Sequence, residues 1–111
     1  MKKLYVITRA DLPPGAQLAQ SCHAVSAFAT DFPSTHAEWH RHGQNLVALQ
    51  VPGQAELDAL LERVLMSEEI ERVSAFREPD LAHQLTAIAF GDEAQRLVSS
   101  LPLALRAPRA A

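Results

Sequence analysis

Twelve residues near the N-terminus carry the side chains best suited to chemistry. The run from Gly15 to Ser26 reads Gly-Ala-Gln-Leu-Ala-Gln-Ser-Cys-His-Ala-Val-Ser and begins at the end of a Pro-Pro-Gly turn. Within it, Gln20, Ser21 and His23 bring together an amide, a hydroxyl and an imidazole. A helix that starts at Gly15 has unpaired backbone N–H groups in its first turn, and these groups and the helix dipole favour a negative charge. The run therefore predicts a site for an anionic ligand or a developing oxyanion.

The segments around this run are typical of a strand, a turn and a helix. Residues 3–8 are rich in β-branched and aromatic types, and residues 9–15 hold several turn formers. From residue 17 on, apolar side chains recur at helical spacing and predict the face that packs on the core, namely Leu18, Cys22, Val25 and Ala29. We therefore expect Cys22 to be a core residue and not a reactive thiol. His23 lies one position from this face, so it either packs against the core or acts in a site.

The rest of the chain predicts an α/β fold. Mostly apolar runs indicate further strands at residues 46–51, 72–76 and 85–90, the first of them covered on both faces. Thr35 and Glu38 fit the capping box of a short helix that Trp39 anchors to the core. A longer helix is expected to lie on the sheet through Leu57, Leu60, Leu61, Val64 and Leu65. With a last helix after Gly91, this order predicts α/β/α layers, a four-stranded mixed sheet flanked by helices.

The order of the elements also predicts where the site lies. Open α/β sheets bind ligands beyond the carboxyl ends of their parallel strands. The loops that leave the first and third predicted strands span residues 9–15 and 77–84. If these two strands run parallel, both loops and the helix start share one rim of the sheet. We therefore expect the substrate-binding residues at this rim, namely Arg9, Asp11, Gly15, Arg77, Glu78 and Asp80.

Length and composition restrict the class of protein. The chain of 111 residues is long enough for one core, and we expect a single domain over residues 1–105 and a frayed tail over residues 106–111. A net charge of −3 gives no overall basic field for nucleic acid, so RNA binding would need a local patch. The sequence shows neither an apolar run that could span a membrane nor a signal peptide, and its single Cys22 forms no internal disulfide. We therefore expect a cytoplasmic protein without a membrane partner.

A cluster of histidines raises a competing interpretation as a metal site. His36 and His40 fall on one face of the predicted short helix, with Glu38 between them and His42 nearby. The spacing differs from the zinc-protease pattern His-Glu-x-x-His, because the glutamate follows the first histidine by two residues and not by one. Elemental analysis of protein purified without a His tag tests this interpretation.

The run Gly15 to Ala24 resembles the signature of the class II peptidyl-tRNA hydrolases. In that signature a glycine and a lysine precede, three residues on, the sequence Gln-Cys-x-His-Ala. Four positions match it, namely Gly15, Gln20, His23 and Ala24. The likeness continues in order along nearly the whole chain, through Trp39, Gly43-Gln44, Pro52, Thr86 and Gly91.

The resemblance implies hydrolysis of the ester between a peptide and tRNA, with neither a metal nor another cofactor, and a homodimer. The family assigns the chemistry to a lysine, an aspartate and a threonine. Here Ala16 stands at the lysine position, the signature's Ser and Cys are exchanged, and the aspartate has no single equivalent, because Glu78 or Asp80 could replace it. Arg9 or Arg77 could supply the missing cation. The expected catalytic residues are Gln20, Ser21, His23 and the retained Thr86.

Two functional hypotheses follow. The first is a peptidyl-tRNA hydrolase or a close esterase relative, because the pattern spans the chain and keeps Gln20, His23 and Thr86. The second is a module that binds tRNA or protein on the same fold without catalysis, because Ala16 carries no charge. Loss of a group that stabilises developing charge lowers the rate by about 10²-fold or more. The two hypotheses differ in whether bound substrate turns over.

Overall fold

Four strands and four α-helices make up the computed structural model, which describes residues 1–106. In chain order they are β1 (Lys3–Arg9), α1 (Pro14–Asp31), α2 (Pro33–His42), β2 (Asn45–Val51), α3 (Gln54–Met66), β3 (Val73–Glu78), β4 (Gln84–Gly91) and α4 (Gln95–Val98). Short 3₁₀ helices cover Pro79–Leu81 and Asp92–Ala94. In the described range, no helix has the length and apolar character needed to cross a membrane. Most of the tail expected to be frayed, residues 107–111, lies outside the described residues.

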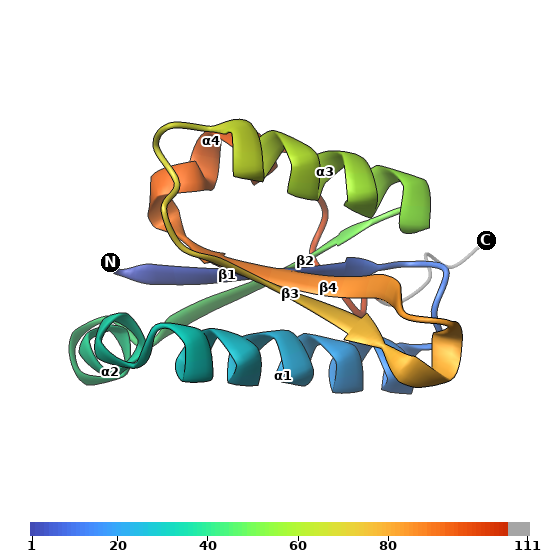
Figure 1. Ribbon diagram of the computed structural model, residues 1–111, viewed down its shortest axis with the longest axis horizontal. Helices are drawn as coiled ribbons and strands as arrows, with labels where there is room; N and C mark the ends of the chain where they lie inside the picture. The colour runs from blue at the N-terminus through green and yellow to red at the C-terminus, as the bar shows by residue number, and fades with distance from the viewer. Residues whose placement is uncertain (107–111) are drawn as a thin grey trace.

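The strands form one mixed sheet in the order β2-β1-β4-β3. β1 pairs parallel with β2, and β4 pairs antiparallel with both β1 and β3. Helices α1 and α2 cover one face of the sheet and α3 and α4 the other (Figure 1). The predicted α/β layer fold is confirmed. β1 and β3 both oppose β4 and therefore run in the same direction, so the loops that leave them lie at one rim, as the sequence predicts.

Because side chains alternate between the two faces of the sheet, each face has its own apolar core. Beneath α3, the side chains of Tyr5, Ile7, Leu49 and Ile88 pack with the buried leucines of the helix. On the α1 face, the core holds Leu4, Val6, Ala24, Phe28, Trp39, Ala87 and Ala89. The small alanines of α1 and β4 allow the helix to lie close to the sheet. This close approach brings polar side chains of α1 within reach of β3 and β4.

The face that α1 turns to the sheet differs from the predicted face. Leu18 is 54% exposed and Cys22 is exposed, so the prediction that Cys22 belongs to the core is wrong. The buried residues of α1 are instead Gln17, Gln20, Ser21, Ala24 and Phe28. The physical reason is that two of these polar side chains find partners: Gln17 Nε2 donates to the Leu12 carbonyl, and Gln20 bonds to β3 and β4. Phe28, fully buried, supplies the apolar anchor that Leu18 does not.

β2 and α2 also depart from the expectations. β2 is an edge strand, and Leu46 is 49% exposed on its α1 side, so the strand is not covered on both faces. The C-terminal segment protects its outer edge, because Gln50 N donates to the Pro102 carbonyl and Ala104 N donates to the Ala48 carbonyl. α2 starts at Pro33 without a side-chain cap, so the predicted capping box is wrong. Trp39 anchors α2 as predicted, because it is buried and donates its indole N–H to the Asn45 carbonyl.

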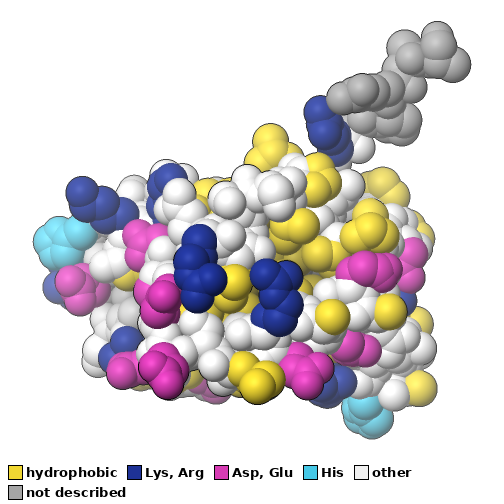
Figure 2. Space-filling view, turned by 90° about the horizontal axis from the view of Figure 1, so that it is seen from above, with side chains coloured by type: hydrophobic (Ala, Val, Ile, Leu, Met, Phe, Trp, Pro, Cys, Tyr) yellow, Lys and Arg dark blue, Asp and Glu magenta, His cyan; other side chains and the backbone are white. Residues whose placement is uncertain are grey.

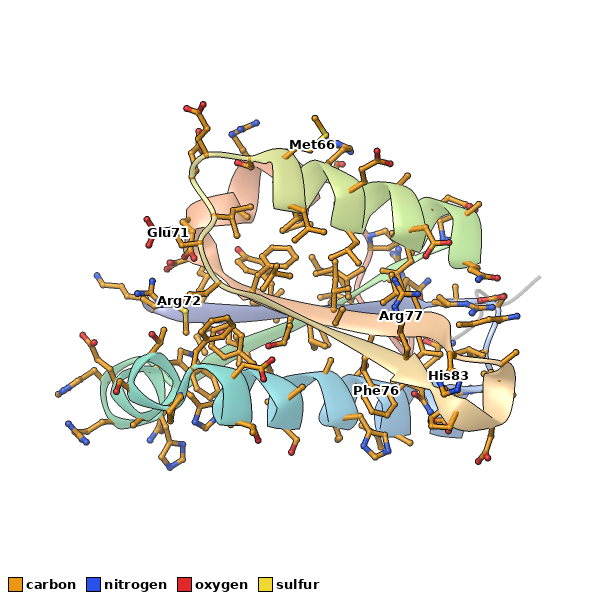
Figure 3. The ribbon with its side chains drawn as sticks, viewed as in Figure 1. Met66, Glu71, Arg72, Phe76, Arg77 and His83 are labelled. Carbon is orange, nitrogen blue, oxygen red and sulfur yellow. The ribbon has the colours of Figure 1, made fainter. Side chains whose placement is uncertain are left out.

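β3 and β4 form a hairpin that extends beyond the predicted strand ends. β3 continues through Glu78, so Arg77 and Glu78 belong to the strand and not to the loop. Ala82 and His83 adopt positive φ angles of 53° and 60°, which turn the chain back into β4. Because strand side chains alternate, Phe76 and Glu78 lie on the α1 face and Arg77 on the α3 face. Figure 3 shows Phe76 and Arg77 on opposite sides of β3.

Candidate active site

A chain of hydrogen bonds joins three residues that are far apart in the sequence. The Thr86 hydroxyl donates to Gln20 Oε1 at 2.7 Å, and Gln20 Nε2 donates to Glu78 Oε2 at 2.9 Å. Thr86 is fully buried and Gln20 is 8% exposed, whereas the Glu78 side chain is only half-buried. The Gln20 amide therefore connects a buried hydroxyl to a carboxylate that solvent can reach. We call Gln20, Glu78 and Thr86 the amide cluster.

A β-bulge places Thr86 under α1. Phe76 opposes Ala87 and Arg77 opposes Leu85, so Thr86 is an extra residue on β4. The Thr86 hydroxyl also lies 3.3 Å from the Phe76 carbonyl, and Thr8 on β1 donates its own hydroxyl to the Thr86 carbonyl at 3.0 Å. The Thr8 hydroxyl thus supplies a partner for the Thr86 carbonyl at the bulge. These contacts hold the Thr86 side chain directed at α1.

The surroundings of Glu78 favour its charged form. The hydrogen bond from Gln20 is the main cause that lowers the pKa of the Glu78 carboxyl, and a second bond from the Asp80 backbone N–H, at 3.2 Å, adds to it. The positive charge that His23 can carry lowers this pKa further. Glu78 is therefore ionised at neutral pH and accepts hydrogen bonds. Asp80 itself is exposed and enters the cluster only through its backbone.

His23 forms the outer wall of the cluster. Its imidazole stacks on the Phe76 ring with 4.4 Å between the centroids and 13° between the planes. Phe76 covers one face of the imidazole, and His23 is exposed, so the ring is not packed in the core. From the sequence, Phe76 is predicted only as a strand residue. The alternation of β3, with Ser74, Phe76 and Glu78 on one face, is the signal that would have found it.

The two arginines that could replace the family lysine lie on the α3 face. Arg9 is buried and bonds Asp11 through two nitrogens, at 3.0 and 2.7 Å. Its Nη1 donates to Gln84 Oε1 and to the Leu85 carbonyl. The hydrogen bond with Arg9 lowers the pKa of Asp11, and the same bond raises the pKa of Arg9. Arg9 therefore ties the end of β1 to β4, while Arg77 points away from α1 (Figure 3).

The start of α1 is open. Pro13 is the N-cap and Pro14 the first helical residue, and no side chain caps the helix. A Cβ atom at Gly15 would meet nothing within 4 Å, so neither packing nor the backbone requires glycine there. Ala16, at the position of the family lysine, is half-buried and carries no charge. Gln17 Oε1 is buried and has no hydrogen-bond partner among the described residues.

Ser21 lies apart from the amide cluster. It lines an apolar groove of about 320 Å³ between α1 and β2, which we call the α1–β2 groove. The helix face that the helical spacing predicts for the core forms one wall of this groove, namely Leu18, Cys22, Val25 and Ala29. Leu46 and Ala48 of β2 form the other wall. The structure thus brings Gln20, His23, Glu78 and Thr86 together and leaves Ser21 on the other flank of the helix.

The histidines of α2 do not assemble a metal site. The rings of His36 and His40 lie parallel with 6.3 Å between their centroids. Within residues 1–106, no three His, Cys, Asp or Glu side chains are arranged so that they could hold a metal ion. His36 instead lines the α1–β2 groove and contacts the Trp39 ring.

Comparisons with known proteins agree with this architecture. The model of one protein family, described as peptidyl-tRNA hydrolase PTH2, matches residues 2–103. No curated protein matches the chain. A solved structure, described as a protein of unknown function from Agrobacterium tumefaciens strain C58, superposes with a TM-score of 0.64 at 16% identity, and the match covers 91% of this chain and 96% of that chain. At this identity the second likeness shows the fold alone.

Proposed function

The chain belongs to the PTH2 family of peptidyl-tRNA hydrolases, and on this premise we propose that it hydrolyses the ester that joins a peptide to tRNA at the amide cluster. The observation that carries the proposal is the pair of hydrogen bonds that fixes the Gln20 amide between Thr86 and Glu78. Ester hydrolysis needs a positioned water, a group that takes its proton and a donor for the oxyanion. The amide cluster offers an acceptor and a donor side by side. The translation intermediate that such an enzyme consumes makes the cytoplasm its proposed location.

Glu78 and Gln20 divide the chemistry between them. The ionised Glu78 carboxylate orients a water and takes its proton as the water oxygen bonds to the ester carbonyl carbon. The second N–H of the Gln20 amide, which Glu78 does not occupy, stabilises the oxyanion. When the bond between the carbonyl carbon and the ribose oxygen breaks, Glu78 returns the proton to that oxygen. Thr86, fully buried, acts as a positioning residue, because it reaches the substrate only through Gln20.

His23 and the start of α1 serve substrate binding in this proposal. The open face of the His23 ring, supported from behind by Phe76, offers a stacking surface for the terminal base of tRNA. Stacking of a base on an aromatic side chain contributes about 1–3 kcal/mol. The open space at Gly15 admits a phosphate or carbonyl oxygen close to the free N–H groups of the first helical turn. Ser21 and the two arginines of the α3 face have no part in this scheme.

The test is release of an acetylated amino acid from acetylaminoacyl-tRNA by the purified protein. The proposal expects turnover well above the rate in buffer, with a loss in the Glu78→Gln variant. Thr30→Val is the matched control, because Thr30 is an exposed residue of α1 whose hydroxyl, among residues 1–106, bonds the Ser26 carbonyl alone. A rate equal to that in buffer, even at high protein concentration, contradicts the proposal.

Ala16 supports a second candidate function, a module that binds tRNA without hydrolysing it. Neither Arg9 nor Arg77 faces the cluster, so neither arginine replaces the family lysine there. This function predicts saturable tRNA binding without turnover. The Ala16→Lys variant separates the two candidates: a large gain in rate from a silent wild type supports the module, and an already active wild type excludes it.

We also propose that the protein forms a homodimer through the α1–β2 groove. The groove places exposed Leu18 and Leu46 on opposite walls, and an apolar surface of this kind on a single chain is typical of an interaction site. A two-fold axis through the groove pairs the same surface of both copies. Sedimentation of the wild type at micromolar concentration tests this: a monomer contradicts it.

A further inference from the structure

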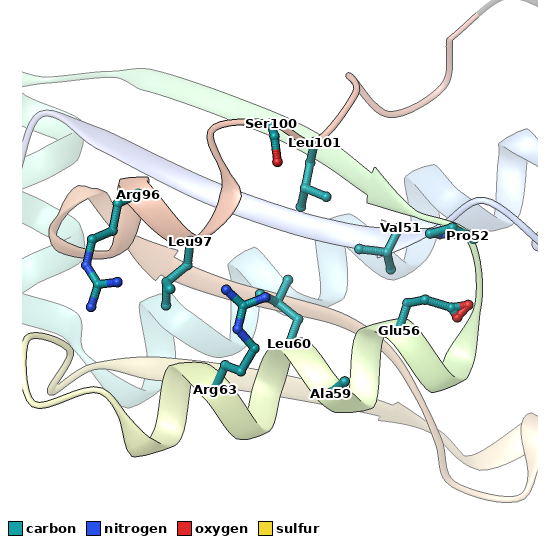
Figure 4. A pocket seen from close by; sticks show the side chains of 10 residues that line it. All are labelled: Val51, Pro52, Glu56, Ala59, Leu60, Arg63, Arg96, Leu97, Ser100 and Leu101. Carbon is teal, nitrogen blue, oxygen red and sulfur yellow. The ribbon is translucent and has the colours of Figure 1, made fainter.

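A second hollow lies on the face of the sheet opposite the amide cluster. It measures about 430 Å³ and opens between α3, α4 and the end of β2 (Figure 4). Seen from above, this face of the molecule shows Lys and Arg side chains beside apolar atoms at the bottom of a depression (Figure 2). We call this depression the α3–α4 hollow. It has no part in the proposed hydrolysis.

The last helix is short and leaves the apolar floor of the hollow uncovered. α4 ends at Val98, and the chain then turns away to pair with β2 through the Pro102 carbonyl. One flank of α3 is therefore not covered by another helix. Leu60 of α3 and the half-buried Leu97 and Leu101 form the bottom of the hollow.

The two ends of the hollow carry charged side chains of opposite sign. The guanidinium groups of Arg63 and Arg96 extend toward the gap between α3 and α4, and Glu56 lies at the other end of the hollow (Figure 4). Arg63 makes no hydrogen bond or ion pair with any residue from 1 to 106. Arg96 bonds Glu69 at 3.2 Å through Nε alone, so both of its terminal nitrogens remain available. One end of the hollow thus carries two arginines, one of them already paired with Glu69 through Nε, and the Glu56 end repels an anion.

We propose that the α3–α4 hollow binds a small amphipathic anion, a carboxylate or sulfonate on an apolar body. The head group lies between Arg63 and Arg96, whose planar forks match the two oxygens of a carboxylate. The apolar body covers Leu60, Leu97 and Leu101, and the repulsion from Glu56 fixes which end of the ligand meets the arginines. The volume falls in the range of about 300–1,000 Å³ that is typical of small-molecule sites.

A fluorescent probe and two competitors test both halves of the proposal. Anilinonaphthalene sulfonate is an apolar anion that brightens in apolar sites, and decanoate and decanol are competitors with and without a charge. The sulfonate binds the wild type saturably, decanoate displaces it, and decanol displaces it far more weakly. In the Arg63→Gln/Arg96→Gln variant the Kd of the sulfonate rises about tenfold, because two charge-assisted contacts are lost. Both replaced residues are exposed, so the variant keeps the fold.

Two further variants locate the probe. Ala59→Phe fills the hollow from an exposed position of α3, and it abolishes binding of the sulfonate. Arg41→Gln removes an exposed arginine of α2, on the other face of the sheet, and leaves the Kd unchanged. Equal binding by the double arginine variant and the wild type overturns the proposal, as does equal displacement by decanol and decanoate. Absence of saturable binding by the wild type overturns it as well.

Discussion

Replacement of Thr86 by valine separates a positioning role from a merely structural one. Valine keeps the shape of threonine but removes the hydroxyl that donates to Gln20 Oε1 at 2.7 Å. Gln20 is 8% exposed, so its oxygen gains no water in exchange. An unpaired buried acceptor lowers the free energy of unfolding by about 1–3 kcal/mol. Since small domains are stable by about 5–15 kcal/mol, the variant remains folded and its activity can be measured.

The same change acts on turnover more strongly than on stability. Without the Thr86 hydroxyl the Gln20 amide is held by its bond to Glu78 alone, and misplacement of a reacting group by about 1 Å can lower the rate by about 10²-fold. We therefore expect kcat to fall by this order while KM stays constant, because Thr86 is fully buried and does not touch the substrate. Urea unfolding followed by the fluorescence of Trp39, the only tryptophan, gives the stability, and release of acetylated amino acid gives kcat and KM.

A double-mutant cycle with Gln20→Leu completes the test. Because the two side chains bond each other, the coupling free energy is expected to be about 0.5–3 kcal/mol, and Thr86→Val costs little once Gln20 is gone. The control Thr30→Val on the exposed face of α1 changes the stability by less than about 0.5 kcal/mol. The reasoning is refuted if Thr86→Val keeps the wild-type kcat, or if its stability loss is the same with and without Gln20.

Other predictions follow from the same geometry. Gln20→Glu sets a second carboxylate against Glu78, so Tm falls at neutral pH and recovers on acidification as the two carboxyl groups share a proton. The exchange Gln20→Glu/Glu78→Gln restores Tm at neutral pH. A loss of Tm that does not depend on pH refutes the contact between the two residues. Because the pKa of Glu78 is lowered, its carboxylate is lost only as the pH falls below the usual glutamate range, and the acid limb of the kcat/KM profile, which reports the free enzyme, lies there. Gly15→Ala does not lower Tm, since its Cβ meets nothing within 4 Å, but raises KM. An unchanged KM means that no substrate approaches the helix start. Leu18→Glu keeps the fold and converts the dimer to a monomer in sedimentation, and a dimer that persists places the interface elsewhere.

The sequence predicts the layers and the rim because both depend on strong local signals. Apolar runs and turn residues define the strands, and two strands that run the same way bring their loops to one edge whatever the details. Leu57, Leu60, Leu61 and Val64 are buried on α3 as the helical spacing predicts. Leu65, at the border of that face, is exposed, since only the central stripe touches the sheet.

The orientation of α1 could not be read from the sequence because the helix buries polar side chains and exposes apolar ones. Periodicity assumes that Leu18 and Cys22 face the core, but the contacts of Gln20 with Thr86 and Glu78 become visible only when β3, β4 and the helix are assembled. Buried polar side chains are usually hydrogen-bonded, so the bonds of Gln20 to Thr86 and Glu78 explain why α1 can bury this residue.

The ends of strands were the second source of error. β3 extends two residues beyond the predicted strand, through Glu78. Arg77 therefore lies on the α3 face and Glu78 on the α1 face. The sequence left Glu78 and Asp80 as equal candidates for the missing aspartate. The register of the hairpin gives Glu78 the contact with Gln20 and leaves Asp80 exposed.

The most direct test of the proposed chemistry is single-turnover hydrolysis of acetylaminoacyl-tRNA by the wild type and the Glu78→Gln variant, with Thr30→Val beside them. The account predicts release by the wild type well above the rate in buffer, an equal rate for Thr30→Val, and a loss in Glu78→Gln of about 10²-fold, as expected for removal of a general base. Release by Glu78→Gln at the wild-type rate, or by the wild type at the buffer rate, would contradict the central claim that the amide cluster hydrolyses the ester.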